Sequence, residues 1–120
     1  MPVEKKKIQS HKDLVVWQKS YLLAKQIYLM TKKLPSAENF GLVSQIQRSA
    51  VSVPSNIAEG FGRKSNKSFK QFLLIAYGSL AELDTQISLA KDIYTVPIES
   101  ELLLIEEVRK MLSALIKKLD

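Results

Sequence analysis

A row of polar side chains recurs every three or four residues between positions 45 and 59, a spacing that places its members on one helix face. A solvated helix face usually carries Lys and Glu, whereas this row is rich in groups that hydrogen-bond within a fold. A second, shorter row follows between positions 79 and 86. Together the two rows predict a structural polar network of Arg48, Ser52, Asn56, Glu59, Ser79 and Glu82.

Arg48 is the only cation of the longer row, and a partly buried arginine needs an acidic partner. We expect it to pair with Glu59 or Glu82. If that pair is buried, Arg48→Ala costs about 2–4 kcal/mol of stability; a cost below about 0.5 kcal/mol means that Arg48 faces water. The network lies either within one chain or between subunits, and a ligand or nucleic-acid site is the alternative interpretation.

The same residues form a poor basis for catalysis. The chain has no cysteine, and its one histidine, His11, lies outside every expected helix, so helical Glu-x-x-His metal pairs are absent. Glu82 and Asp84 are two residues apart and point to different helix faces. Glu59 and Glu82 could meet, which leaves a metal-dependent hydrolase as a remote alternative. We therefore expect no catalytic residue, no metal site and no cofactor.

A basic cluster lies just after the longer polar row, where residues 61–70 contain four cations and no acid. The whole chain carries 18 Lys and Arg against 12 Asp and Glu, a formal charge of +6. Such a turn is either simply solvated or binds phosphate backbones in a salt-dependent, sequence-independent way. Because Phe61 is the one aromatic residue here expected to be exposed, stacking on successive bases is disfavoured. The candidate nucleic-acid contacts are Arg63, Lys64, Lys67 and Lys70.

Four stretches with helical periodicity must position these groups: 13–34, 42–59, 66–94, and a fourth that follows Pro97 and ends near residue 119. Their short connections predict an all-α, antiparallel, up-down-up-down four-helix bundle over 13–120. Residues 1–12 are expected to form a flexible basic arm, at the opposite end of the bundle from the basic turn.

The second stretch contains Pro54, which lacks an N–H and leaves the carbonyl of Ala50 without its helical donor. We expect a kink there, or a break with a restart near Ser52, and a side-chain bond from Asn56 or Ser52 to the freed carbonyl. The glycines at 60–62 are expected to end this helix in the left-handed conformation. At the start of the first stretch, Asp13 is expected to be the N-cap.

The first stretch carries two apolar stripes side by side, more than one bundle helix needs for its own core. The surplus predicts a subunit interface, of the cyclic kind. No secretory signal and no run of 18 apolar residues is present, so we expect a cytoplasmic protein that does not enter a membrane.

Three segments resemble a known family: 14–19 (LVVWQK), 44–60 (SQIQRSAVSVPSNIAEG) and 76–83 (AYGSLAEL). They are similar to the bacterial four-helix-bundle proteins encoded within intervening sequences of 23S rRNA genes, over roughly 13–119. Asp84 stands where many members have Glu. The pattern positions of the resemblance are Arg48, Ser52, Pro54, Asn56, Glu59, Gly60, Ser79 and Glu82.

The resemblance implies a small bundle that assembles into homopentamers. A related basic pentamer, the accessory variability determinant of diversity-generating retroelements, binds nucleic acid and a reverse transcriptase. Combined with the charge, this predicts a non-enzymatic homo-oligomer, expected as a pentamer, that binds RNA or DNA weakly through its basic surface. The alternative is a structural or adaptor protein that binds another protein and has no nucleic-acid role.

Overall fold

The computed structural model describes residues 7–120 and consists of helices joined by short connections, with no strand in that range. The all-α class with four long helices is therefore confirmed. The helices are α1 (Val15–Thr31), α2 (Leu42–Gly62), α3 (Asn66–Tyr94) and α4 (Glu99–Lys118), with 3₁₀ turns η1 (His11–Asp13) and η2 (Ser36–Glu38). None of these helices is long and apolar enough to cross a membrane.

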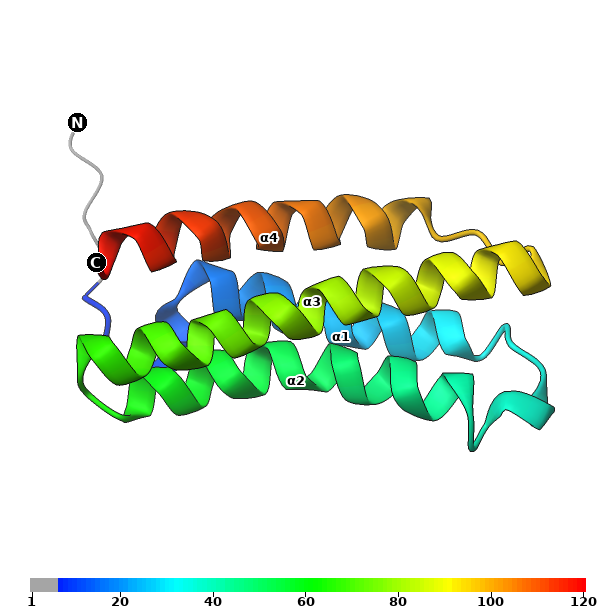
Figure 1. Cartoon of the computed structure of the whole chain (residues 1–120), viewed down its shortest axis with the longest axis horizontal. Helices are drawn as coiled ribbons and strands as arrows, with labels where there is room; N and C mark the ends of the chain where they lie inside the picture. The colour runs from blue at the N-terminus through cyan, green and yellow to red at the C-terminus, as the bar shows by residue number, and fades with distance from the viewer. Residues whose placement is uncertain (1–6) are drawn as a thin grey trace.

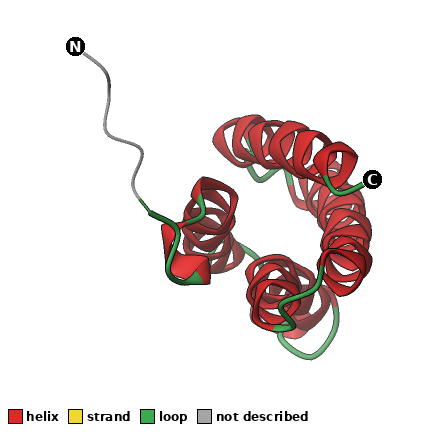
Figure 2. Cartoon of the chain, turned by 90° about the vertical axis from the view of Figure 1, so that its left-hand side faces the viewer, coloured by secondary structure: helices red, strands yellow, loops and turns green. Residues whose placement is uncertain are grey.

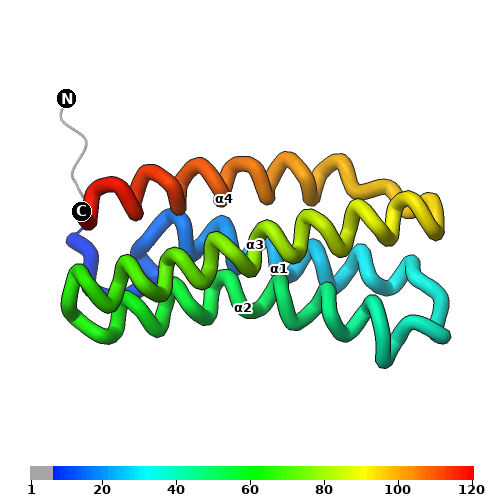
Figure 3. The backbone as a smooth tube through the Cα atoms, viewed as in Figure 1, coloured from blue at the N-terminus to red at the C-terminus, as the bar shows by residue number. Residues whose placement is uncertain are grey.

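Successive helices lie side by side along a molecule of 48 × 34 × 20 Å. The chain runs in one direction in α1 and α3 and in the opposite direction in α2 and α4 (Figure 1), and the backbone trace shows the three connections alternating between the two ends (Figure 3). Each helix contacts its neighbours in chain order, and α4 closes back on α1. The arrangement leaves one face of every helix directed outward.

The core is built from the apolar stripes that the periodicity predicted. Along α3 the buried positions follow the 4-3 spacing, with Leu73, Leu80, Leu83 and Ile87 almost fully inaccessible. Burial of each such side chain stabilises the fold by about 1.5–3 kcal/mol. The largest fully buried side chains of the other helices are Leu23, Ile27, Ile46, Ile57 and Leu112.

Helix α2 continues through Pro54 without interruption, so the expected break near Ser52 is wrong, whereas a bend of the axis stays a prediction. The Asn56 side chain donates to the carbonyl of Ser52 at 2.8 Å and not to that of Ala50. The physical reason is reach: a helical side chain lies over the turn four residues before it, and Ala50 is six residues back.

The C-terminus of α2 also differs from the expectation. The helix extends to Gly62, and no glycine of the described chain has a positive φ. Lys64 takes the left-handed conformation instead, with φ 60°. For a residue with a Cβ this conformation costs about 1–2 kcal/mol, so the turn into α3 holds a lysine where glycine would be less strained.

Hydrogen bonds order the segment before α1 from Gln9 onward. The flexibility expected of residues 1–12 stays a prediction, and residues 1–6 lie outside the described part of the chain. Ser10 and Asp13 form a capping box around η1, and the Gln9 N–H donates to Asp13 Oδ2 at 2.9 Å. Asp13 is therefore not the N-cap of α1, which is Leu14. The segment is joined to α1 by the Gln18 side chain, which donates to the Lys12 carbonyl at 2.8 Å, and by the edge-to-face contact of His11 with Trp17.

Candidate functional site

The start of the described chain, the α2–α3 turn and the end of α4 all lie at one end of the molecule, at the left of Figure 1 and facing the viewer in Figure 2. This corrects the expectation that the N-terminal segment and the basic turn lie at opposite ends. Two helices of opposite direction return the chain to its starting end, so residue 11 and residue 63 become neighbours. We call this region the basic end.

The four predicted nucleic-acid contacts lie on the basic end and differ in their pairing. Arg63 Nε donates to Glu59 Oε2 at 2.9 Å, and its guanidinium lies 5.2 Å from the centre of the Phe72 ring. Lys70 pairs with Asp120. Lys64 and Lys67 are exposed and have no ion-pair partner among residues 7–120.

Four further cations lie at the same end, although the sequence did not place them beside this turn. They are exposed and come from the N-terminal segment and the last turn of α4: Lys7, Lys12, Lys117 and Lys118. The basic end also holds the acids Asp13, Glu59 and Asp120, which its cations outnumber, whereas the opposite end carries both signs in nearly equal number. The charged residues of the opposite end are Lys32, Lys33, Glu38, Lys91, Asp92, Glu99 and Glu101. The fold therefore concentrates the positive charge of the described chain at one end.

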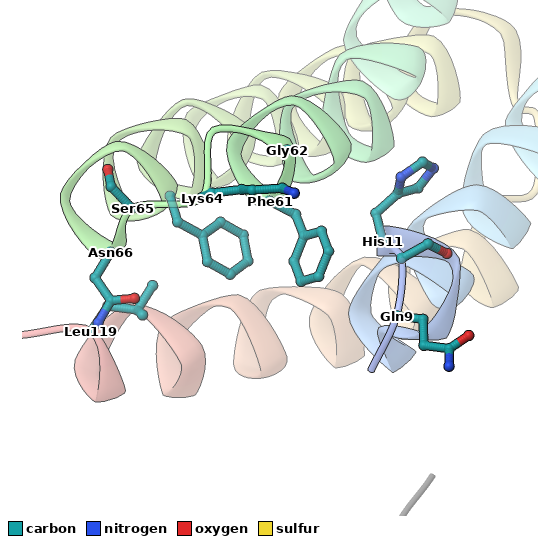
Figure 4. A pocket seen from close by; sticks show the side chains of 10 residues that line it. Gln9, His11, Phe61, Gly62, Lys64, Ser65, Asn66 and Leu119 are labelled. Carbon is teal, nitrogen blue, oxygen red and sulfur yellow. The ribbon is translucent and has the colours of Figure 1, made fainter. Parts of the chain in front are cut away.

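A pocket of about 630 Å³ opens in the basic end between the N-terminal segment and the α2–α3 turn. Figure 4 shows the Phe61 ring in its middle, with Ser65 and Asn66 on one side and His11 on the other. Phe61 packs edge-to-face on Phe69, with ring centres 5.9 Å apart. No motif in the sequence indicates this pocket, because segments distant in the sequence form it only when the helices pack together.

Three members of the predicted polar network come together between α2 and α3. The hydroxyls of Ser52 and Ser79 lie 2.8 Å apart, and Asn56 Nδ2 donates to Ser52 Oγ at 2.9 Å. Ser79 is buried and the other two are half-buried. This bridge links one position on α2 to one position on α3.

The charged members of the network do not join it. Arg48 is exposed, and no described residue forms an ion pair with it, which corrects the expected pairing with Glu59 or Glu82. Glu59 lies about 16 Å further along the same helix and pairs with Arg63, one turn away. Arg48 lies in a groove with Tyr28 of α1, whereas exposed Glu82 lies along α3.

Glu38 makes a polar link that the sequence did not predict, at the end opposite the basic end. Its carboxylate accepts from Tyr94 Oη and from the N–H of Leu42 at the start of α2. These bonds hold the pKa of Glu38 below its usual value, and the bond to the Glu38 carboxylate raises the pKa of Tyr94. Among residues 7–120 no group of three or more His, Asp or Glu side chains is placed to hold a metal ion.

Two helices expose rows of large apolar side chains. On α1 the row repeats every seven residues through Val15, Leu22 and Leu29, of which Leu29 is 61% exposed. On α3 the exposed side chains, here called the α3 row, form two groups about 21 Å apart along the helix: Leu74 with Ile75, and Leu89 with Ile93. Beside the α1 row, an apolar groove of about 280 Å³ runs between Tyr21 and Val51. Of the two stripes predicted for the first helix, one is buried in the core, and the other is exposed only at Tyr21 and Tyr28, because its remaining members are half-buried against the core. The row of Val15, Leu22 and Leu29 belongs to neither stripe and was not predicted.

The sequence profile of the family described as 23S rRNA-intervening sequence protein matches residues 12–117. The chain belongs to this family. The matched range of the 23S rRNA-intervening sequence protein runs from η1 to the last turn of α4, so it includes the bundle core, the Ser52–Ser79 bridge and the basic turn. A comparison with individual curated proteins found no significant match.

Proposed function

We propose that this protein is a non-enzymatic homo-oligomer, a pentamer by its family resemblance, that binds RNA or DNA weakly through its basic end. The observation that carries the proposal is the gathering of the N-terminal segment, the α2–α3 turn and the end of α4 at one end of the bundle. A cytoplasmic location belongs to the same proposal.

The charge at the basic end suits a phosphate backbone. Lys64 and Lys67 are exposed and unpaired among the described residues, so they are available for phosphate oxygens. The pair of Arg63 with Glu59 is also exposed, and in the pair of Lys70 with Asp120 the lysine is half-buried and the carboxylate is exposed. Exposed pairs contribute only about 0–1 kcal/mol, so a phosphate can replace either carboxylate at little cost. Contacts of this kind neutralise charge without reading bases.

Assembly is supported by the two exposed apolar rows, which lie on different helices. A two-fold dimer uses one self-complementary patch, whereas a ring needs two different patches that meet head to tail. The α1 row and the α3 row supply such a pair. Five chains of charge +6 would together carry about +30, which strengthens attraction to a polyanion.

An adaptor role for another protein remains the second candidate, and the apolar groove between α1 and α2 favours it. In that case the positive charge serves only solubility. The remote hydrolase alternative has little support, because Glu59 is engaged by Arg63 and Glu82 is exposed on another helix. We therefore assign no catalytic residue.

The nucleic-acid proposal is tested by fluorescence anisotropy with mixed-sequence RNA and DNA, from low to high salt. The double variant Lys64→Gln/Lys67→Gln is compared with Lys32→Gln/Lys33→Gln, which removes the same charge from the opposite end. We expect the first to weaken binding several-fold and to reduce the slope of log affinity against log salt by about 1.4–1.8, and the second to change neither.

Absence of binding at low ionic strength, or equal effects of the two double variants, would refute the assignment of the basic end. Assembly is tested separately by light scattering at low and high salt. Leu29→Glu on α1 and Ile93→Glu on α3 are each expected to reduce the mass of the particle. A monomeric mass for the unchanged protein would remove the oligomer from the proposal.

A further inference from the structure

We propose that the pocket of the basic end takes one nucleotide, with its base against Phe61 and its phosphate between Lys64 and the start of α3. This inference rests on the proposed function and deepens it, because it assigns a site where a single-stranded chain would be anchored. The pocket volume of about 630 Å³ lies within the range of small-molecule sites.

The aromatic side of the pocket suits one base. Phe61 is half-buried, and its edge-to-face contact with Phe69 holds the ring at an interplanar angle of 80°. A base that stacks on such a ring gains affinity whatever its identity. Phe61 and Phe69 are the two phenylalanines that line the pocket, so we expect it to accommodate a single base and not a run of stacked bases.

The polar side of the pocket suits a phosphate. Ser65 caps α3 by accepting the N–H of Ser68 at 3.2 Å, which leaves the N–H groups of Asn66 and Lys67 without acceptors inside the helix. These donors lie at the positive end of the longest helix, which has 29 residues. Lys64, which lines the pocket, adds a full charge beside them.

The cation of the pocket is Lys64, whose backbone adopts the left-handed conformation with φ 60°, as that of Thr95 does after α3. Glycine would adopt this conformation without strain. The position therefore carries a lysine at a cost in strain, and the side chain of that lysine faces the pocket that Phe61 and Asn66 also line. A site with an aromatic ring on one side and a cation with free N–H donors on the other matches the two halves of a nucleotide.

The experiment titrates the full chain with AMP, adenosine and inorganic phosphate, followed by NMR amide shifts. We expect AMP to perturb the amides of 9–11 and 61–66 and to bind more tightly than adenosine or phosphate alone. Lys64→Gly keeps the turn relaxed and is expected to weaken AMP about tenfold while leaving adenosine unchanged. The matched control is Lys33→Ala, which removes one charge from the opposite end of the bundle and is expected to change AMP affinity less than twofold.

The proposal is overturned if AMP perturbs no pocket amide at millimolar concentration, if phosphate alone binds as tightly as AMP, or if Lys64→Gly and Lys33→Ala weaken AMP equally. Phe61→Leu keeps the apolar volume and tests the stacking half, with reduced affinity expected for AMP and adenosine alike. If AMP binds in the pocket but oligonucleotides fail to bind at low salt, the proposed nucleic-acid function is refuted and the nucleotide site is supported. If oligonucleotides bind and AMP does not, the nucleotide site is refuted and the proposed nucleic-acid function is supported.

Discussion

Gly60→Ala tests the closest approach of α2 and α3. Gly60 is buried in the last turns of α2, and a Cβ added there would lie 2.6 Å from Phe72 Cβ, 3.1 Å from Phe69 Cδ1 and 3.3 Å from the Phe69 carbonyl oxygen. Phe72 Cβ is bonded directly to the backbone of α3, so a rotamer change cannot relieve the contact. The two helices would have to separate.

The magnitude follows from two opposing effects. Replacing glycine by alanine inside a helix gains about 1 kcal/mol from backbone propensity. Overpacking typically costs about 1–3 kcal/mol, and a contact as short as 2.6 Å on a fixed atom belongs at the upper limit. We therefore expect Gly60→Ala to lower the free energy of unfolding by about 2 kcal/mol, which corresponds to roughly 8 °C in Tm for a chain of this size.

Gly78→Ala is the matched control, because a Cβ at Gly78 in α3 meets nothing within 4 Å. It should raise the free energy of unfolding by about 1 kcal/mol, so the two glycines respond with opposite signs. Urea denaturation at several protein concentrations measures both variants and separates folding from assembly. A Gly60→Ala protein as stable as the unchanged chain would refute the reasoning, because it would mean that α2 and α3 separate without cost.

Three further perturbations test the polar groups. Ser79→Ala should lower the free energy of unfolding by about 1 kcal/mol in urea denaturation, since it removes the hydrogen bond to Ser52. An unchanged denaturation midpoint would show that this bond does not stabilise the contact between α2 and α3. Arg48→Ala should lower the free energy of unfolding by less than about 0.5 kcal/mol, because the side chain is exposed. A decrease above about 2 kcal/mol would show that Arg48 forms a buried ion pair after all. The lowered pKa of Glu38 means that its ionised form stabilises the fold above the ordinary value of 4.5, and that this contribution is lost as the pH falls through the lowered pKa. Glu38→Gln should therefore flatten the acid side of the stability profile, and an identical profile would show that the bond with Tyr94 is not formed.

The helices and the buried core residues could be predicted from the sequence. The 4-3 spacing along 66–94 predicted both the length of α3 and its buried residues, because helical periodicity is a local property of the chain. The same holds for Ser52, Asn56 and Ser79, whose polar types at core-flanking positions indicated a bridge between helices. The family resemblance was likewise carried by residues adjacent in the sequence.

The ion pairs could not be predicted from the sequence. The sequence predicted an acidic partner for Arg48, but could not show on which side of the contact between α2 and α3 each side chain lies. In the folded chain Arg48 borders the groove with α1 while Glu82 lies along α3 away from that groove. Glu59 is instead satisfied by Arg63, a neighbour one helical turn away.

The sequence by itself determined that this protein is a small basic helical chain, which of its residues enter the core and to which family it belongs, because these properties reside in residue types and their local spacing. Only the tertiary structure decided where the charge and the pocket lie. Cations distant in sequence, such as Lys12, Lys64 and Lys118, gather at one end because each pair of opposed helices returns the chain to its starting end. Proximity created by chain reversal leaves no mark on local sequence, and it is this proximity that forms the basic end and the pocket beside Phe61.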